Sequence, residues 1–375
     1  MHSISISQVD ALFVNGGYPI EFVLYFPGGI PTRTLRTALR RLSNTFWPLF
    51  GRYRDGAILR STRYVEDDYF LETVGDGEFD TTLDAMGIRE TFKDTNSPAV
   101  DALFFMSVVQ FGNGTVLVPR MQHLVGDGYS YFYFLSVLAT LSKPSSLPFR
   151  GQVIRFLAAP RLPRTLLRDY HFTRTDIEAR PVDPDCTIRL ERIPRQQVEQ
   201  EITRINSESG AGVSANDFLS AMVVREAARR QPSGTREHFS LTTPVDVRRG
   251  IKQLGPKFLG NGILLHRQRF SMDELENTDV ATLALRLRQA APRISAQRYG
   301  DYLAALEAEI ASQPTCCLGP YDPDQGCLVT NLSRMPIQRL DFGAGSPGLV
   351  MPITIGRNSV AMLADREDFL LRFAD

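Results

Sequence analysis

The N-terminal part of the chain alternates short apolar runs with helical periodicity. Residues 21–26 are almost continuously apolar or aromatic, and so short a run predicts a buried strand. Apolar side chains then recur at a spacing of three and four residues, which predicts an amphipathic helix. The residues of this stripe are Leu35, Ala38, Leu39, Leu42 and Phe46.

A hairpin is predicted further along the same half. Two apolar runs, residues 102–111 and 115–120, flank the turn Gly112-Asn-Gly114. Glycine and asparagine between two such runs favour a tight turn that joins antiparallel strands. The sheet therefore has an antiparallel component, and the protein is not a purely doubly wound α/β fold.

The second half predicts short strands between helices. Ser214 stands where its hydroxyl can cap a central helix. The expected elements are a strand over 187–193, helices over 194–209, 214–230, 273–293 and 299–312, and a terminal hairpin of 349–355 with 361–363.

Composition changes between the two halves. From residue 143 to 184 prolines and arginines are frequent and no long periodic run occurs, which is typical of a connecting segment. We therefore expect an N-terminal domain over residues 1–145, a crossover over 146–185 and a C-terminal domain over 186–375. A length of 375 residues is enough for two domains of ordinary size.

Charge and cysteine content exclude several classes of function. The chain has 42 basic and 42 acidic side chains, so no net field favours nucleic acid or an anionic membrane as a partner. No apolar run approaches the roughly 20 residues of a spanning helix, and the start lacks the pattern of a signal peptide. We therefore expect a cytoplasmic protein. The four cysteines show no zinc-binding spacing, so we expect no metal.

The most informative motif is His123-Leu-Val-Gly-Asp127-Gly128. A strand-like run precedes it, and apolar and aromatic residues at helical spacing follow over 129–141. His123 thus lies on a tight turn between a strand and a helix, where both elements fix its position. A neutral histidine there can take a proton from a hydroxyl or amine. Taken alone, the pattern is more typical of a structural histidine than of a catalytic one.

A second motif, Asp341-Phe-Gly-Ala-Gly345, changes the interpretation. Together the two motifs resemble the BAHD family of acyl-CoA-dependent acyltransferases, within the superfamily of chloramphenicol acetyltransferase and peptide-synthetase condensation domains. The resemblance covers nearly the whole chain, and four further segments carry it in the family's order: residues 41–53, 214–222, 245–249 and 258–262.

The sequence also departs from the family pattern. Gln122 stands before the histidine where many members have a second histidine, and Ala344 replaces the usual tryptophan of the second motif. Asn331-Leu332 stands where the family often has a Ser-Trp pair. These differences suit a divergent microbial or fungal member.

The resemblance implies an α/β fold of two chloramphenicol-acetyltransferase-like domains with mixed sheets and an active-site channel at their interface. It implies transfer of an acyl group from acyl-CoA, a co-substrate rather than a permanently bound cofactor, to a hydroxyl or amine of a small specialised metabolite. His123 would be the general base, and no acyl-enzyme would form. The enzyme is expected to be a monomer.

Other positions take their expected roles from the same resemblance. Asp127 would pair with Arg248, or with Arg249 as the alternative partner, and support the site. Orienting His123 in a triad is the alternative role. The Gly128 N–H would approach the thioester. Asp341, Gly343 and Gly345 would form a structural turn that shapes the channel.

Two residues of the second half are candidates for substrate contacts. Thr330 matches a position that faces the acyl or acceptor group, so its hydroxyl could donate to a developing oxyanion; a strand residue with local hydrogen bonds is the alternative. Ser214, at the start of the central helix, is a candidate for the coenzyme phosphates because free N–H groups there favour anions.

The sequence does not exclude three other functions. In the first, the donor is a thioester on an acyl carrier protein, docked on the arginine-rich crossover (Arg150, Arg155, Arg161, Arg164, Arg168). In the second, His123 serves a cyclisation or rearrangement without a thioester. In the third, the protein only binds a ligand, although retention of His123 and Asp127 argues against this.

Overall fold

The computed structural model describes most of the chain in two compact units. The described residues are 3–14, 19–92, 101–143, 155–156, 173–175, 186–231, 237–252, 254–256, 258–312, 317–353 and 356–374. Unit 1 comprises Met1–Arg161, Ile251–Gly262 and Met335–Thr354, and unit 2 comprises Leu162–Gly250, Ile263–Arg334 and Ile355–Asp375. The arginine-rich crossover lies outside the described residues, except for the backbone of β8 (Arg155–Phe156) and β9 (Thr173–Thr175).

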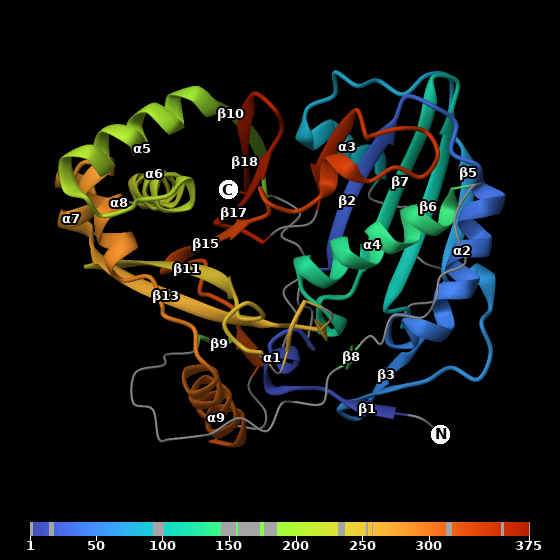
Figure 1. The fold of residues 1–375 in the computed structure, drawn as a ribbon, viewed down its shortest axis with the longest axis horizontal. Coiled ribbons are helices and arrows are strands. Elements are labelled where there is room, and N and C mark those ends of the chain that lie inside the picture. Colours follow the sequence, from blue (N-terminus) through green and yellow to red (C-terminus); the bar gives the residue numbers. More distant parts are fainter. Residues whose placement is uncertain are drawn as a thin grey trace. The chain divides into compact units, whose positions relative to one another are not determined.

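Unit 1 is built on a mixed five-stranded sheet with the order β16-β2-β7-β6-β5 (Figure 1). The hairpin of β6 and β7 turns at Gly112 and Asn113, as the sequence predicts. The edge strand β5 pairs in parallel with β6, whereas the other neighbours are antiparallel. The strands are β2 (Ile20–Phe26), β5 (Phe70–Val74), β6 (Phe104–Phe111), β7 (Gly114–Met121) and β16 (Leu349–Pro352).

Two helices of unit 1, α2 (Thr32–Thr45) and α4 (Gly128–Ser142), pack against each other. The predicted apolar stripe of α2 is confirmed, since its members are buried. Helix α4 is apolar around most of its circumference, which is typical of a helix covered on several sides. The remaining elements are β1 (Ser3–Ser5), α1 (Gln8–Ala11), η1 (Trp47–Phe50), β3 (Arg52–Arg54), β4 (Ala57–Leu59), η2 (Glu66–Asp68), α3 (Ala85–Phe92), η3 (His123–Val125), β12 (Phe258–Leu259) and η4 (Ile337–Arg339).

Unit 2 has a mixed six-stranded sheet with the order β10-β18-β17-β15-β11-β13. The parallel pairs are β11 with β15 and β15 with β17. The strands are β10 (Ile188–Pro194), β11 (His238–Asp246), β13 (Ile263–Ser271), β15 (Gly326–Asn331), β17 (Ser359–Ala364) and β18 (Asp368–Ala374). A short strand β14 (Cys317–Gly319) pairs with β9 outside this sheet.

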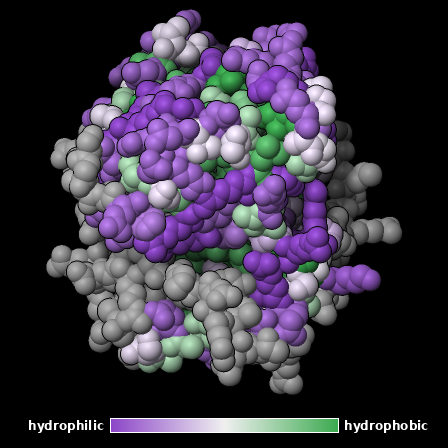
Figure 2. Space-filling view, turned by 90° about the vertical axis from the view of Figure 1, so that its left-hand side faces the viewer, coloured by the Kyte–Doolittle hydropathy of each residue, from purple (hydrophilic) through white to green (hydrophobic). Residues whose placement is uncertain are grey.

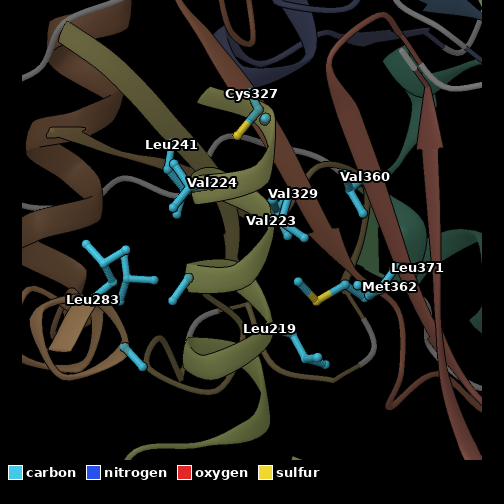
Figure 3. Packing of buried hydrophobic residues seen from close by; sticks show 14 of the residues in the cluster. Leu219, Val223, Val224, Leu241, Leu283, Cys327, Val329, Val360, Met362 and Leu371 are labelled. Atoms are coloured by element: carbon cyan, nitrogen blue, oxygen red, sulfur yellow. The ribbon is translucent and has the colours of Figure 1, made fainter. Parts of the chain in front are cut away.

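The core of unit 2 surrounds α6 (Ala215–Arg229), the central helix that the sequence predicts. Side chains of α6 face those of the sheet and of α8 (Val280–Gln289) (Figure 3). The labelled members of this cluster are Leu219, Val223, Val224, Leu241, Leu283, Cys327, Val329, Val360, Met362 and Leu371. Burial of each valine, leucine or methionine side chain in this cluster stabilises the unit by about 1.5–3 kcal/mol.

The outer helices of unit 2 carry its polar surface. Helix α5 (Arg195–Ser209) places Arg204 between Glu201 and Glu208, at 3.0 and 3.1 Å, on an exposed face. The face of the molecule shown in Figure 2 is largely hydrophilic where it is not grey. Helices α7 (Met272–Asn277) and α9 (Ala296–Ser312) complete the unit.

One predicted helix, over residues 273–293, is wrong. The chain forms two helices there, α7 and α8. Thr278 is extended, and the side chain of Asp279 accepts a hydrogen bond from the backbone N–H of Thr282, which caps a new helix. Capping by aspartate stabilises a helix start by about 1 kcal/mol, so the break is encoded locally.

The predicted terminal hairpin is also wrong. Strand β16 pairs antiparallel with β2 in unit 1, whereas β17 pairs with β15 and β18 in unit 2. This pairing also changes the domain boundaries that we expect from the sequence. Residues 335–354, with the Asp341 motif, and residues 251–262 belong with the N-terminal residues rather than with the C-terminal part.

Candidate active site

His123 lies on the turn between β7 and α4, as the sequence predicts. It begins the single-turn helix η3, directly after the strand, and is half-buried. The N–H of Gln122 donates to the carbonyl of Leu103 at 2.8 Å, which ties the turn to the start of β6. The imidazole is therefore carried by a backbone that is fixed on both sides.

An aromatic ring covers one face of the imidazole. Phe13, just beyond α1, stacks on His123 with ring centroids 3.8 Å apart and an interplanar angle of 18°. Such stacking restricts rotation of the imidazole about the Cβ–Cγ bond of His123. The sequence gives no sign of this contact, because Phe13 and His123 are 110 residues apart in the chain.

A buried amide binds the same turn from another direction. Nδ2 of Asn261 donates to the backbone carbonyl of His123 at 2.8 Å and to Oδ1 of Asp10 at 2.8 Å. Asn261 is 1% exposed and Asp10 is fully buried. Asn261 belongs to the 258–262 segment that carries part of the family resemblance, but sequence reasoning assigned neither residue a role.

Burial lowers the pKa of His123 below its ordinary value of 6.5. The negative charge of Asp127 and the amide of Asn261 oppose this effect without cancelling it. The ring is therefore neutral near neutral pH, which is the protonation state that a general base requires. Burial also raises the pKa of Asp10 from 3.8 to about 6, although hydrogen bonds from Asn261 and Ser7 lower it.

Asp127 binds backbone N–H groups on two segments. Its Oδ1 accepts from Ser130 at 3.0 Å, which caps α4, and its Oδ2 accepts from Gly262 at 2.9 Å. The hydroxyl of Ser130 donates to the carbonyl of Gly260 at 2.9 Å. Oδ1 therefore caps α4, and Oδ2 joins the histidine turn to the 258–262 segment. With both oxygens engaged in this way, Asp127 suits a supporting role better than a triad. Gly128, half-buried, is the first residue of α4.

Arg248, the expected partner of Asp127, lies in unit 2. Its side chain is 2% exposed, and it forms an ion pair with Asp246 at 3.1 Å. The backbone N–H of Arg248 also donates to the carboxylate of Asp246, at 3.0 Å. The pair between Asp127 and Arg248 stays a prediction.

The Asp341 motif forms a turn at the opposite end of α4. Oδ1 of Asp341 accepts from the N–H groups of Gly343 and Gly345, at 2.9 and 3.0 Å. Gly343 and Gly345 have φ values of 100° and 83°, which residues other than glycine rarely adopt. Lys143, at the C-terminus of α4, donates to Oδ2 of Asp341 at 2.6 Å and lowers the pKa of that carboxyl.

The length of α4 separates this turn from His123. The helix has 15 residues, which at about 1.5 Å per residue is roughly 22 Å. The histidine turn lies at the N-terminus of α4 and Lys143 follows its C-terminus. The Asp341 turn therefore shapes the fold of unit 1 and does not touch the imidazole.

Thr330 and Ser214 both lie in unit 2. Thr330 is half-buried in β15, opposite Ala361 of β17. Ser214 caps α6, and its N–H and hydroxyl donate to the carboxylate of Asp217 at 2.8 and 2.7 Å. The same carboxylate pairs with Arg288 at 2.6 Å. The negative charge of Asp217 thus already lies at this helix start, where the phosphates of the coenzyme were expected.

Among the described residues, no three His, Cys, Asp or Glu side chains gather closely enough to hold a metal ion, and no helix is long and apolar enough to cross a membrane. Cys186 and Cys327 are both buried. Burial raises the pKa of the Cys327 thiol to about 12, so it is not a thiolate nucleophile at neutral pH.

Comparison with known structures identifies the fold. The structure matches TRI101 of F. graminearum complexed with coenzyme A and deoxynivalenol, with a TM-score of 0.73 at 13% identity, over 100% of this chain and 95% of that one. Vinorine synthase matches with a TM-score of 0.73 at 16% identity, over 100% of this chain and 91% of that one. The expected fold class, an α/β acyltransferase fold of the chloramphenicol-acetyltransferase type, is confirmed.

Comparison with known sequences identifies the family. The model of the Transferase family matches residues 66–368. Shikimate O-hydroxycinnamoyltransferase of Nicotiana tabacum is 24% identical over 92% of this chain and 85% of its own length. Anthranilate N-benzoyltransferase protein 1 of Dianthus caryophyllus is 22% identical over 86% of this chain and 76% of its own.

The chain therefore belongs to the Transferase family of BAHD acyltransferases. It is an enzyme that transfers an acyl group from acyl-CoA, its co-substrate, to a hydroxyl or amine.

Proposed function

We propose that His123 is the general base of an acyl transfer to a small specialised metabolite. The observation that carries this proposal is the imidazole itself, which is held under Phe13 and has a pKa lowered by burial. A neutral imidazole in a fixed position can remove a proton from an acceptor hydroxyl or amine, and a positioned base contributes about 10²–10⁴-fold to the rate.

The reaction proceeds without an acyl-enzyme in this proposal. The acceptor oxygen or nitrogen attacks the thioester carbonyl while His123 takes the proton of the acceptor. The carbon–sulfur bond then breaks, and the protonated imidazole returns the proton to the sulfur of the departing coenzyme A. The buried Cys327, with its raised pKa, supports this direct route over a cysteine nucleophile.

The other site residues assist in this proposal. Asp127, with Arg248 as its partner, holds the turn, and the Gly128 N–H and the Thr330 hydroxyl are candidate donors to the oxyanion. Ser214 is the weakest candidate, because the carboxylate of Asp217 at the same helix start would repel the phosphates of coenzyme A.

Some relatives support a choice of donor and acceptor class. Three of those that match over most of the chain are named for hydroxycinnamoyl or benzoyl transfer, and two of these names include shikimate and anthranilate. We therefore propose an aromatic acyl donor and a small acceptor with a hydroxyl or amine. The alternative of a carrier-protein donor depends on arginines of the crossover whose side chains lie outside the described residues.

Donor binding is tested first, because this needs no acceptor. Thermal unfolding is measured with free coenzyme A and with acetyl-, malonyl-, benzoyl- and hydroxycinnamoyl-CoA. A ligand at about 100 times its dissociation constant stabilises the protein by about 2.7 kcal/mol, which raises the melting temperature measurably. A shift that is largest for an aromatic acyl group supports the proposed donor; equal shifts for all of them would contradict it.

The general base is tested with the donor so found and a library of hydroxyl and amine acceptors. His123→Ala should lower kcat by about 10²–10⁴-fold. His266→Ala is the matched control, because His266 in β13 is also half-buried and its pKa is also lowered by burial. Full activity of a folded His123→Ala protein would refute the assignment.

A further inference from the structure

The rings of Phe13 and His123 are stacked unusually closely. Their centroids are 3.8 Å apart and the interplanar angle is 18°, so one ring lies almost flat on the other. Neutral aromatic pairs favour offset or edge-on arrangements with centroids about 4.5–7 Å apart. The edge-on pair of Phe104 and Phe134, at 4.9 Å, is an example in the same unit. A close, flat contact becomes favourable when one ring is positively charged, because a cation is attracted to the face of an aromatic ring.

Phe13 is held in this position by the segment that carries it. Its side chain is buried, and its backbone N–H donates to the carbonyl of Asp10 at 2.9 Å, directly after α1. Helix α1 is closed by hydrogen bonds between Ser7 and Asp10, and it contacts η3, the turn that begins with His123. The phenyl ring is therefore already in place against the imidazole before a proton is transferred.

The proposed reaction creates a positive charge on this buried imidazole. When the acceptor attacks the thioester carbonyl, its proton moves to His123, and the neutral base becomes an imidazolium. Burial disfavours the charged form, which is the reason for the lowered pKa of His123. A group that stabilises only the charged form would therefore lower the barrier of the reaction.

The nearby carboxylates do not bond to the imidazole as they would in a triad. Asp127 favours the protonated ring through its negative charge, but both of its oxygens accept from backbone N–H groups. The carboxylate of Asp10 is bonded to Ser7 and Asn261. Nδ1 of His123 is buried, and no carboxylate bonds to it within the described part of the chain. The direct stabilisation of an imidazolium that a triad provides is thus missing from this part of the structure.

We propose that Phe13 stabilises, through the π face of its ring, the imidazolium that forms on His123 during acyl transfer. Phe13 is a positioning residue in this inference, because it acts on the reaction only through His123. Since the attraction between a cation and a π face exists only while the imidazole is charged, it favours the transition state over the ground state. This inference rests on the proposed role of His123 as the general base.

Fluorination of the Phe13 ring tests the charge effect at nearly constant shape. Phenylalanine with one, two or three ring fluorines is introduced at this position through a reassigned stop codon. Each fluorine withdraws electron density from the ring face and so weakens its attraction for a cation. The value of kcat should fall stepwise along the series, by about 3-fold to 30-fold in total, with little change in the melting temperature or in the KM for acyl-CoA.

The same fluorinated series at Phe342 is the matched control. This ring is also buried in unit 1, but it packs edge-on against Phe26, and its turn lies beyond the far end of α4 from His123. Its fluorination should leave kcat unchanged. Equal losses of kcat at both positions, or a kcat that does not change along the series at Phe13, would overturn the inference.

A second measurement does not depend on turnover. NMR titration, with His123→Gln to assign the signal, gives the pKa of His123 directly. Phe13→Leu keeps an apolar side chain against the imidazole but removes the π face, so the pKa of His123 should fall further, by about 0.4–1.5. A phenyl ring that only excludes water predicts no such fall, and the pKa would stay constant or rise towards 6.5 in Phe13→Leu.

The two proposals fail in different ways. Full activity of a folded His123→Ala protein would refute the assignment of the general base, whatever the effect of Phe13 on the pKa of His123. The role of Phe13 alone would be refuted if His123→Ala were inactive while neither kcat nor the pKa of His123 changed with the number of fluorines on the Phe13 ring.

Discussion

The buried carboxyl of Asp10 should make the stability of the protein depend on pH in a defined direction. Burial raises its pKa from 3.8 to about 6. At about 1.36 kcal/mol per pH unit, this shift corresponds to about 3 kcal/mol. Because the pKa is higher in the folded state, this contribution to stability is fully present below pH 3.8 and is lost as the pH rises through about 6.

Asp10→Asn removes this dependence, because an amide does not titrate. The difference in unfolding free energy between Asp10→Asn and the unmodified protein should therefore move in favour of the variant as the pH rises. About 2 kcal/mol of the change should appear between about pH 4.5 and pH 7.5. The constant offset from the lost carboxylate hydrogen bonds does not enter, since only the change with pH is compared.

Urea denaturation at a series of pH values measures this difference, provided that the variant and the unmodified protein have equal m-values. Asp80→Asn is a control that should show almost no change over this pH range. Hydrogen bonds from Thr82 lower the pKa of the Asp80 carboxyl from 3.8, so its contribution to stability changes only at lower pH. A difference between Asp10→Asn and the unmodified protein that is constant over this pH range would refute the reasoning, since it would mean that the buried carboxyl ionises as if it were in water.

Three further predictions concern the histidine turn and the two ends of α4. Gly126→Ala should lower the free energy of unfolding by about 1–3 kcal/mol, because a Cβ at this position would lie 2.8 Å from Cβ of Ser130. Gly29→Ala is the control: a Cβ there would meet open space, so the free energy of unfolding should change by less than about 0.5 kcal/mol. Urea denaturation measures both. Lys143→Ala should lower the free energy of unfolding by less than about 1 kcal/mol, because the ion pair between Lys143 and Asp341 is partly exposed. A larger loss would mean that the Asp341 turn depends on this ion pair. The pH profile of kcat should fall on the acid side with an apparent pKa below 6.5, because burial lowers the pKa of His123 and only the neutral ring is a base; a value above 6.5 would contradict this.

Local patterns predicted the parts of the site that depend on neighbouring residues. The stripe of α2 and the strand–turn–helix around His123 follow from periodicity over a few residues, and both are present. The predicted hairpin after residue 349 failed for a physical reason. Two short apolar runs on either side of a turn carry no information about more distant strands, and here β2 and β15 are the partners.

The contacts around the imidazole could not be predicted from the sequence. The hydrogen bond between Asn261 and Asp10 joins residues 251 positions apart, and no local pattern reports such a contact. One signal was available, because Ser7 and Asp10 have the spacing of a capping box. That pattern indicates where a helix begins, but it does not indicate that the acid is buried beside an active site.

The segments that form unit 1 are synthesised at widely separated times during translation. Domains generally fold as units, N-terminal first, while the ribosome is still at work. Unit 1 contains residues 251–262 and 335–354 as well as the N-terminal segment. Asn261 is synthesised 138 residues after His123, and β16 later still. During translation the edge of β2 therefore stays unpaired until β16 has been synthesised, and the carboxylate of Asp10 has Ser7 but not Asn261 as a hydrogen-bond donor until residue 261 has been made.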